Sequence, residues 1–488
     1  MARAKPELTP DFMYQRILAK DRGYDGRFLT GVLTTGIYCL PSCPARKPKA
    51  ENVRFFRRED EAVAQGLRPC RRCRPELFYR GENWDQSLYL GLLQRLREDP
   101  ARFADIGDLA KACGISSTKL NDLVRSEAHL TPAALLHRER LRRACGLLLD
   151  SRDRVIDIAY AVGYDGEATF HRQFLTATGM TPGTYRGLRG NDRFQLQLPA
   201  DFRAEEALAY HGRDKDGPAE RRIGGQRLIK TALLDGQPAV LDLAFGKGVL
   251  DCRVIAQKKM SPTAMAEAHH ILLRMIGLNS DAAAFEARGK RDTTIRRLTA
   301  TQPGLRIPLT PTLFEAVAWA IIGQQINLAF ATALRRDLIE LAGRKVPGAG
   351  DMRLHPDADA IADLDPGDLT SRRFSRSKTA YLIDVAKLVA GGELDFATLA
   401  DGSARAAEAR LLALRGLGPW TVNYVMLRGF GFADAVPVGD SALATALQRF
   451  HQREVRPDAR ETAELMARFA PHRSLATCHF WASLKMAA

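Results

Sequence analysis

The sequence contains no uninterrupted apolar stretch of about 18 residues, the length that a membrane-spanning helix needs. Its first residues, "MARAKPELTPDFMYQRILAKD", lack the apolar core of a secretory signal peptide. A lone basic amphipathic helix, typical of proteins that lie on a membrane surface, is also missing. We therefore expect a cytoplasmic protein without a membrane partner, whose eight cysteines do not form a disulfide framework.

Acidic residues are in the minority, with 57 Asp and Glu against 72 Lys and Arg. The resulting formal charge of +15 indicates a polyanionic partner, and double-stranded DNA is the first choice because each cation placed on a phosphate releases counterions. The length of 488 residues, 45% of them hydrophobic, is enough for roughly three or four folded domains.

The cysteines near the N-terminus form two closely spaced pairs, Cys39 with Cys43 and Cys70 with Cys73. Two such pairs in a reducing compartment predict one tetrahedral Zn²⁺ held by four cysteines. The zinc could be purely structural, and the arginines around it could simply bind phosphate. A zinc-held thiolate, however, stays ionised at neutral pH and can attack an electrophilic methyl group, so the spacing leaves both interpretations open.

The residues around these cysteines, "TTGIYCLPSCPAR", "ENVRFF" and "GLRPCRRCRPE", resemble the N-terminal domain of the bacterial adaptive-response regulator Ada family. That family moves a methyl group from a DNA methylphosphotriester onto the first of its four zinc-bound cysteines. The resemblance implies that Cys39 is both ligand and methyl acceptor, and that the transfer is irreversible. It also implies phosphate contacts from nearby side chains, for which the candidates are Thr35, Arg46, Arg68 and Arg72.

Two helix-turn-helix patterns follow, one with its turn at Gly114 and a second helix from about Ser116, the other with its turn at Gly163 and a helix from about Glu167. The pair, 49 residues apart, resembles the AraC/XylS type of DNA-binding domain. The resemblance implies promoter binding as an activator, with RNA polymerase as a further partner. The candidate groove residues, each of which could instead belong to a solvated helix face, are Thr118, Lys119, Asn121, Thr169, His171 and Arg172.

The residue pattern changes from helical to strand-like after residue 190. Strand-like runs separated by Asp-Gly and Gly-Lys-Gly turns predict a small antiparallel sheet there. From about residue 310 onward the pattern is helical. We expect a multidomain, mainly α protein with α+β parts. Its expected segments are a zinc domain over 1–80, a double helix-turn-helix domain over 81–190, a small antiparallel-sheet domain over 191–300 and a helix-hairpin-helix core over 301–488.

The stretch "LLALRGLGPWTVNYVMLRGFGFADAVPVGDSALATALQRF" carries a glycine-punctuated turn between two helical runs. Gly416 and Gly418 leave backbone amides open to a DNA phosphate, and Asp440 precedes the next helix. An aspartate in that position is also an ordinary N-cap. Together the features resemble the helix-hairpin-helix DNA glycosylase superfamily, and the region from about 193 to 488 resembles its bacterial 3-methyladenine glycosylase II branch.

This second resemblance implies that Asp440 stabilises an oxocarbenium-like sugar while a flipped, alkylated purine leaves. Trp420 stands where relatives that cut the DNA backbone carry a lysine, so a monofunctional glycosylase without lyase activity is expected. Trp420, Tyr424 and Trp481 match aromatic positions of the base pocket, with core packing as the plain alternative. Gln325 occupies the place of a leucine wedge in one relative, and a monovalent cation at the hairpin is also implied.

Taken together, the sequence predicts a monomeric alkylation-response protein that joins a methylphosphotriester acceptor, a promoter-binding region and a DNA glycosylase. The competing interpretation is a transcription regulator with a structural zinc site, whose glycosylase fold only grips DNA. The Pro-Cys-His-Arg motif of the second methyltransferase that often ends Ada proteins does not occur.

Overall fold

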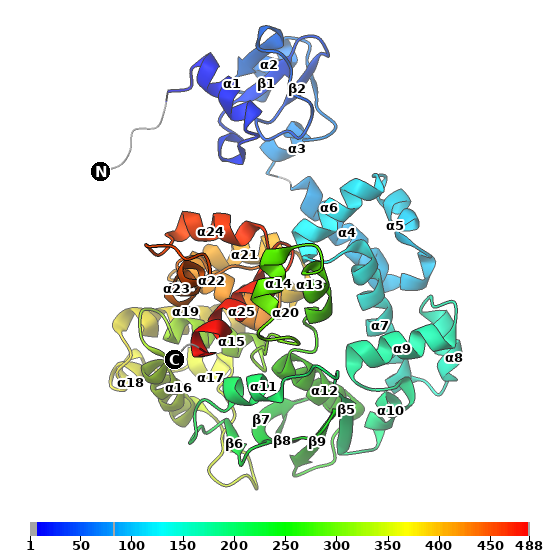
Figure 1. The fold of residues 1–488 in the computed structure, drawn as a ribbon, viewed down its shortest axis with the longest axis vertical. Helices are drawn as coiled ribbons and strands as arrows, with labels where there is room; N and C mark the ends of the chain where they lie inside the picture. The colour runs from blue at the N-terminus through cyan, green and yellow to red at the C-terminus, as the bar shows by residue number, and fades with distance from the viewer. Residues whose placement is uncertain (1–6, 82, 487–488) are drawn as a thin grey trace. The chain divides into compact units, whose positions relative to one another are not determined.

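A computed structural model describes residues 7–81 and 83–486 (Figure 1). The chain forms two compact units, Met1–Gly91 and Leu92–Ala488, which we call the cysteine unit and the large unit. The outer ends of the first and last expected segments, 1–6 and 487–488, and residue 82 in the second, lie outside the described residues. Within the described part of the chain, no helix is long and apolar enough to cross a membrane.

The cysteine unit is built on a small sheet with the strand order β3-β1-β2-β4. Its strands are β1 (Leu29–Val32), β2 (Ile37–Cys39), β3 (Val53–Phe56) and β4 (Arg68–Pro69), and its short helices are α1 (Pro10–Leu18), α2 (Glu59–Ala64) and α3 (Pro75–Tyr79). Strand β2 pairs with β4 in parallel, Tyr38 opposite Pro69. Because parallel strands end at the same edge, this register brings Cys39, the last residue of β2, beside Cys70, which follows β4.

The helix-turn-helix region begins with α4, whose residues span the boundary between the two units, and it continues in the large unit along the predicted plan. Its helices are α4 (Trp84–Glu98), α5 (Ile106–Cys113), α6 (Ser117–Ala128), α7 (Pro132–Asp150), α8 (Val155–Ala161), α9 (Glu167–Thr178) and α10 (Pro182–Arg186). Gly114 ends α5 at φ 64°, a left-handed conformation that glycine adopts without strain, and the side chain of Ser116 caps α6 through the amide of Lys119. The two turns therefore lie where the sequence predicts them.

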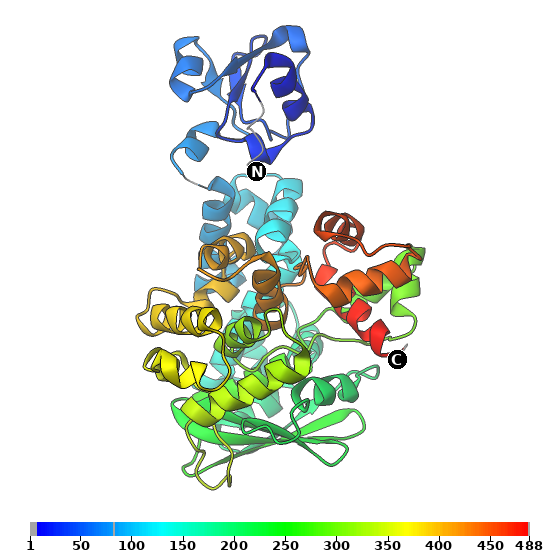
Figure 2. The same ribbon diagram turned by 90° about the vertical axis from the view of Figure 1, so that its left-hand side faces the viewer.

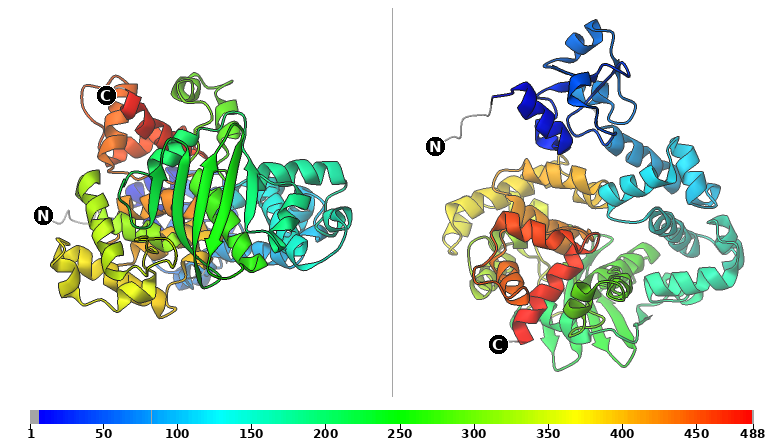
Figure 3. Two further views of the ribbon diagram at one scale, coloured as in Figure 1. Left: turned by 90° about the horizontal axis from the view of Figure 1, so that it is seen from below. Right: turned by 45° about the horizontal axis from the view of Figure 1, so that its top comes forward.

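A five-stranded antiparallel sheet, in the order β5-β9-β8-β7-β6, follows. The strands are β5 (Arg193–Gln197), β6 (Glu220–Ile223), β7 (Arg227–Leu234), β8 (Gln237–Phe245) and β9 (Val249–Ala256), accompanied by helices α11 (Ala204–His211) and α12 (Pro262–Ile276). Seen from below, the strands lie in front and the helices behind them (Figure 3, left). Strands β7 and β8 meet at Asp235 and Gly236, both with positive φ, as a two-residue Asp-Gly hairpin requires.

The remaining chain forms a helical lobe, seen beside the sheet in Figure 2. Its helices are α13 (Ala282–Arg288), α14 (Thr293–Thr299), α15 (Leu313–Ile322), α16 (Leu328–Ala342), α17 (Ala358–Ala362), α18 (Pro366–Thr370), α19 (Arg376–Ala390), α20 (Phe396–Asp401), α21 (Ala404–Leu412), α22 (Pro419–Val425), α23 (Ser441–Phe450), α24 (Ala459–Ala467) and α25 (Arg473–Met486). Helix α15 is buried on all sides, in keeping with its near-continuous apolar sequence.

A buried group of four charges joins the sheet to this lobe. Lys230 on β7 lies 3.0 Å from Glu220 on β6 and 3.2 Å from Glu315 on α15. Arg335 on α16 lies 2.7 Å from Glu220 and 3.3 Å from Glu315. The two positive and two negative charges balance, which is the condition under which charges are tolerated in a protein interior.

Candidate functional site

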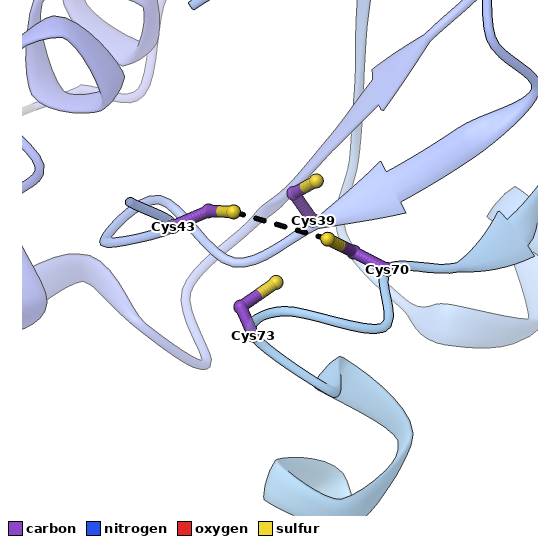
Figure 4. A group of neighbouring side chains, drawn as sticks. All are labelled: Cys39, Cys43, Cys70 and Cys73. Atoms are coloured by element: carbon purple, nitrogen blue, oxygen red, sulfur yellow. Dashed lines mark hydrogen bonds between the residues drawn. The ribbon is translucent and has the colours of Figure 1, made fainter. Parts of the chain in front are cut away.

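The four predicted zinc ligands converge in the cysteine unit (Figure 4). The sulfur atoms of Cys39, Cys43, Cys70 and Cys73 all lie within 4.8 Å of one another, and those of Cys43 and Cys70 are 3.9 Å apart. Zn–S bonds of about 2.3 Å in a tetrahedron place the sulfurs about 3.8 Å apart, so the cluster has the size of a zinc site.

Four thiols at these distances cannot all ionise without a cation. Hydrogen bonds that the Cys39 thiol donates to Cys43 and Cys70 raise its pKa, whereas those that Cys70 accepts from Cys39 and Cys43 lower the pKa of Cys70. The thiols therefore share protons with one another, and a dication that replaces those protons satisfies all four sulfurs.

The sulfurs differ in the hydrogen bonds that they accept from the backbone. The amide of Leu40 donates to Cys73 Sγ and that of Arg72 to Cys70 Sγ, both at 3.4 Å, and the amide of Ala45 donates to Cys43 Sγ. Among the described residues, no N–H group donates to Cys39 Sγ. Because each such bond draws electron density from a sulfur, Cys39 loses the least electron density to backbone donors among the described residues.

A cavity of about 300 Å³ opens beside Cys39. Three of the predicted phosphate contacts, Thr35, Arg46 and Arg72, line it, and all three are exposed. Arg68 is exposed on β4 and is not among the described residues that line this cavity. The cavity, which Cys43 and Cys70 also line, therefore places three of the four sulfurs near two guanidinium groups that a phosphate can contact.

The predicted groove residues lie on the second helix of each helix-turn-helix. On α6, Thr118 is exposed, while Lys119 and Asn121 are half-buried. On α9, the residues Thr169 and Arg172 are exposed and His171 is half-buried, 3.4 Å from Glu167 one turn away. The exposed positions are free to enter a groove, whereas His171 already has a carboxylate neighbour on its own helix.

The predicted hairpin lies between α21 and α22. Gly416 has φ +85°, and a side chain there would collide with the ring of Tyr381. Gly418 caps α22 without a side chain of its own, so the amides at this helix start face outward. Gln324 ties the end of α15 to the hairpin by donating to the carbonyl of Gly416 at 2.8 Å and to Thr421 Oγ1 at 3.0 Å.

Gln325, the residue in the predicted wedge position, follows directly. It is exposed and adopts φ +56°, a left-handed conformation that is rare for residues with a side chain. Such a conformation is common at functional loops, where the surrounding structure holds it. Because Gln324 is anchored on the hairpin, Gln325 projects beside it.

The carboxylate of Asp440 is held by three donors. Its Oδ1 accepts from the amide of Leu443 at 2.7 Å and from Trp481 Nε1 at 2.9 Å. Its Oδ2 accepts from Trp420 Nε1 at 3.0 Å. Asp440 is thus the N-cap of α23, as its sequence context also predicts, and both oxygens in addition receive an indole N–H. The side chain stays half-exposed, so the carboxylate can still contact a ligand.

The three predicted pocket aromatics lie against one another. The ring centroids of Trp420 and Tyr424 are 5.6 Å apart, and those of Tyr424 and Trp481 are 6.2 Å apart. All three are half-buried, and Tyr424 and Trp481 also pack against the core of the helical lobe. Burial raises the pKa of Tyr424 well above the ordinary tyrosine value, so its hydroxyl is neutral and can donate a hydrogen bond.

Sequence reasoning missed four residues of this site. Trp319 on α15 donates to the Tyr424 hydroxyl at 3.0 Å, and Arg213 lies over the rings of Tyr210 (4.3 Å) and Trp319 (4.4 Å). Arg428 lies over the rings of Tyr210 (4.6 Å) and Trp481 (5.3 Å). Trp319 could have been suspected from its place among the small residues of "EAVAWAIIG", but nothing local in the sequence marks Tyr210 or the two arginines.

Comparison with known proteins agrees with this arrangement. Three family models match the chain in order: the metal binding domain of Ada over residues 12–76, a helix-turn-helix domain over 109–187, and the HhH-GPD superfamily of base excision DNA repair proteins over 318–472. The predicted resemblances and the mixed, mainly helical fold are thereby confirmed. The first match and the cysteine cluster together support one Zn²⁺, and the other two support DNA as a partner.

Individual relatives extend the likeness. The chain is 30% identical over 494 aligned positions to the "Probable bifunctional transcriptional activator/DNA repair enzyme AlkA" of Mycobacterium tuberculosis (strain CDC 1551 / Oshkosh), covering 97% of this chain and 96% of that protein. It is 34% identical over 303 positions to the "DNA-3-methyladenine glycosylase" of Bacillus subtilis (strain 168), covering 60% of this chain and 97% of that one. A 3-methyladenine DNA-glycosylase from Archaeoglobus fulgidus shares the fold, with a TM-score of 0.54 at 18% identity over 60% of this chain and 98% of that one.

Proposed function

The chain belongs to the family of bifunctional transcriptional activators and DNA repair enzymes, and on that premise we propose that it answers DNA alkylation by two chemistries. Cys39 accepts a methyl group from a DNA methylphosphotriester, the helix-turn-helix region binds a promoter and engages RNA polymerase, and Asp440 supports the excision of alkylated purines of the 3-methyladenine type. The observation that carries the proposal is the Asp440 carboxylate, held by two indole N–H groups beside a half-open aromatic pocket.

The methyl transfer needs a thiolate, a positioned phosphotriester and no base. Zinc, when bound by the four cysteines, supplies the deprotonated state of their sulfurs. The Cys39 sulfur attacks the methyl carbon, the carbon–oxygen bond breaks, and the phosphate oxygen leaves with the electron pair as an anion. Arg46 and Arg72, which line the cavity beside Cys39, are placed to stabilise that anion. Because a thioether does not return the methyl group, each chain reacts once.

Excision of the base relies on electrostatics. The bond between the sugar and an alkylated purine breaks with both electrons going to the base, which cancels the positive charge of the base. The sugar takes on positive charge, and the Asp440 carboxylate, oriented by Trp420 and Trp481, stabilises it. Water then adds to the sugar carbon and gives up a proton. The stacked rings of Trp420, Tyr424 and Trp481 offer flat apolar faces to the flipped base.

We assign monofunctional chemistry because Trp420 occupies the hairpin position at which lyase relatives place a lysine, so no amine is available there for a Schiff base. The backbone amides of Gly416 and Gly418 would hold a DNA phosphate, and a monovalent cation at the hairpin is part of the same proposal. Gln325 stands where one relative carries a leucine wedge, and we assign it only a contact with DNA. We further propose that the protein acts as a monomer.

A second candidate has an observation in its favour. Asp440 caps α23 through Leu443 and therefore has a structural role whether or not it is catalytic. A transcription regulator with a structural zinc and a glycosylase fold that only grips DNA would need nothing more from this residue.

Base release separates the two candidates. We would compare wild type, Asp440→Asn and Asp458→Asn on duplex DNA that carries 3-methyladenine. Asp458 is a matched control because it caps the next helix, α24, in the same way. We expect Asp440→Asn to lose about 100- to 1000-fold in single-turnover rate, the usual cost of removing a transition-state charge contact, and Asp458→Asn to keep the wild-type rate. Equal rates in all three proteins would favour the inactive fold.

The methyl transfer has its own test. The zinc-loaded protein would be incubated with methylphosphotriester DNA, digested, and its peptides weighed. We expect one added methyl group, on the peptide that contains Cys39 and Cys43, with fragmentation placing it on Cys39. A methyl group on Cys43, Cys70 or Cys73 would reassign the acceptor, and none on any of them would return the cluster to a structural role.

A further inference from the structure

The helix-turn-helix region, residues 92–190, shares a hydrophobic core with the sheet that follows it. Phe174 and Tyr185 pack in one cluster with Phe194 and Leu241. Two hydrogen bonds reinforce this join: the buried His269 on α12 donates from Nε2 to the carbonyl of Thr178 at 2.8 Å, and the amide of Gln197 donates to the carbonyl of Gly179 at 2.7 Å. Helix α9, the recognition helix of the second helix-turn-helix, therefore packs directly against residues 191–488, which we call the glycosylase half.

Helix α6, the recognition helix of the first helix-turn-helix, contacts the helical lobe at its C-terminal end. Glu127, in the last turn of α6, is fully buried, and the hydroxyl of Ser403 at the start of α21 donates to its carboxylate at 2.5 Å. Arg405 lies 3.7 Å from the second oxygen. One residue beyond the helix, His129 Nδ1 accepts from the amide of Asp434 at 3.2 Å, and its ring meets Phe432 edge to face at 5.4 Å.

A cluster of charges forms a second part of the contact between the helix-turn-helix region and the helical lobe. The carboxylate of Asp401, at the end of α20, lies 2.5 Å from Arg97 on α4 and accepts two hydrogen bonds from Arg142 on α7, at 2.5 and 2.7 Å. Arg97 and Arg142 also lie 3.8 and 3.5 Å from the buried Glu139. Although burial opposes ionisation, the guanidinium of Arg142 holds the pKa of Asp401 below its usual range.

We call Glu127, Asp401 and Ser403 the clamp. Glu127 and Ser403 engage the C-terminal end of α6, whereas Asp401 engages α4 and α7 through Arg97 and Arg142. The N-terminal part of α6 stays open, since Ser117, Thr118 and Asp122 are exposed. Helix N-terminal residues are the ones that enter a major groove in helix-turn-helix proteins. The contact therefore holds α6 in place without covering the residues that would enter the DNA groove.

We infer that Asp401 and Ser403, residues of the glycosylase half, are positioning residues for promoter recognition. Ser403 holds the end of α6 through Glu127, Asp401 holds the adjoining helices α4 and α7, and together they fix α6 relative to α9. This inference rests on the promoter binding proposed above. Helix α7, 19 residues and about 28 Å long, carries the first helix-turn-helix away from the shared core, and the Glu127–Ser403 contact supports the end of α6 that leads into it. Because α6 and α9 are held at one separation, binding to two half-sites does not cost the entropy of restricting their relative motion.

The experiment selects binding sites from a pool of random-sequence duplexes with the full-length, zinc-loaded protein. The variants are Asp401→Asn, which keeps the shape of the side chain but loses its charge, and the double variant Asp401→Asn/Glu127→Gln. Asp368→Asn is the matched control, because Asp368 is exposed in the same half and, among the described residues, no hydrogen bond or ion pair to its side chain is found. Amide hydrogen exchange of α6 and base release on 3-methyladenine DNA are measured on the same samples.

We expect wild type and Asp368→Asn to select two half-sites at a single spacing of about one helical turn, roughly 10 base pairs. The clamp variants should keep the half-site read by α9 and lose the fixed spacing to the other. Both should also bind the wild-type sequence at least about tenfold more weakly. The double variant, which replaces the Glu127 carboxylate that accepts from Ser403, should exchange the last turn of α6 about tenfold faster, the loss that a hydrogen bond to a charged group typically produces. Base release should stay at the wild-type rate.

Three results would overturn the inference. If the clamp variants select the same sites at the same spacing, the clamp positions nothing. If α6 exchanges faster while selection is unchanged, α7 alone sets the geometry. If site selection and base release fall together with the melting temperature, Asp401 only stabilises the fold. A wild-type protein that enriches no sequence at all would instead contradict the proposed promoter binding.

Discussion

The cysteine unit and the large unit hold their reactive groups by different means. The main core of the cysteine unit consists of six buried side chains: Leu29, Tyr38, Leu40, Phe56, Ala62 and Leu67. The large unit instead surrounds its pocket with extensive apolar clusters that involve most of its helices. A domain with so small a core needs a metal or another cross-link to stay folded, whereas a large core is stable by itself. Cys39, the proposed acceptor, therefore belongs to the cluster on which the fold of its unit depends, while Asp440 depends on the packing of side chains outside its site.

The largest expected effect follows directly from that contrast. Removing zinc with a chelator should unfold the cysteine unit, because structural zinc contributes an apparent 10–16 kcal/mol, roughly, in small zinc domains. Base release by the large unit should continue at the untreated rate. Zinc release, followed by a thiol-sensitive metal dye, and hydrogen exchange of β1 to β4 would report on the first unit, and the glycosylase assay on the second.

Adding Zn²⁺ back provides the control, since refolding of the cysteine unit should restore methyl acceptance. A cysteine unit that keeps its slow-exchanging amides in the chelator would mean that its six-residue core suffices. The comparison between the units would then lose its physical basis.

The large unit has its own sensitive point in the buried charges that join sheet and lobe. Burial disfavours an ionised Glu315, but Lys230 beside it holds the pKa of the carboxyl below its usual range. Glu315→Gln would leave Lys230 and Arg335 with a single carboxylate, that of Glu220. We expect a loss of about 3–5 kcal/mol in the free energy of unfolding, measured by urea titration.

The matched control is Glu340→Gln, which removes the same charge from an exposed position on α16. It should change stability by less than about 0.5 kcal/mol. If both variants cost the same, the four charges do not brace the two parts of the glycosylase half.

Much of the fold could be predicted because its signals are local. The turns at Gly114 and Gly163, the cap at Ser116 and the Asp-Gly hairpin at residues 235–236 each depend on a few neighbouring residues. The shared core across residue 190 could not be read in this way. It depends on which faces of α9, α10 and α12 meet the sheet, and the apolar pattern of each helix shows only that one of its faces is buried.

The same division holds for the sites. Cys39 and Asp440 carry strong local patterns, namely paired cysteines and an aspartate behind a glycine hairpin. Tyr210 and Arg213 come from the end of α11 and the residues just after it, more than 200 positions before Asp440, and reach the pocket only through tertiary packing. Single-sequence reasoning has no means of placing such residues, because the contact is decided by how α11 packs on the helical lobe.

Acidic pH should destabilise the large unit more than the cysteine unit, because all ten histidines lie beyond residue 91. Burial lowers the pKa of His211, His269 and His479 to about 4. The unfolded chain takes up these protons near pH 6.5, so between pH 6.5 and 4 the unfolded state binds more protons and stability falls as the pH drops. At pH 5 each such histidine should cost about 2 kcal/mol.

Urea unfolding followed by tryptophan fluorescence measures this, because three of the four tryptophans, at positions 319, 420 and 481, belong to the large unit. His269→Gln keeps an N–H that can donate to the Thr178 carbonyl but does not titrate. Its stability should therefore depend less on pH than that of wild type. An unchanged pH dependence would mean that His269 is not held neutral.

The smallest expected effect concerns the two indole N–H groups that orient the Asp440 carboxylate. Trp420→Phe and Trp481→Phe each remove one indole donor from the carboxylate and keep an aromatic ring in the pocket. We expect each to slow single-turnover base release about tenfold, a barrier increase of about 1.4 kcal/mol, because solvent can partly replace a donor at a half-exposed carboxylate. Trp319→Phe is the control, since its N–H bonds Tyr424 and not Asp440, and it should slow release less. Three equal effects would mean that the tryptophans act only as pocket walls, and orientation of the carboxylate would then have to come from its cap on Leu443 alone.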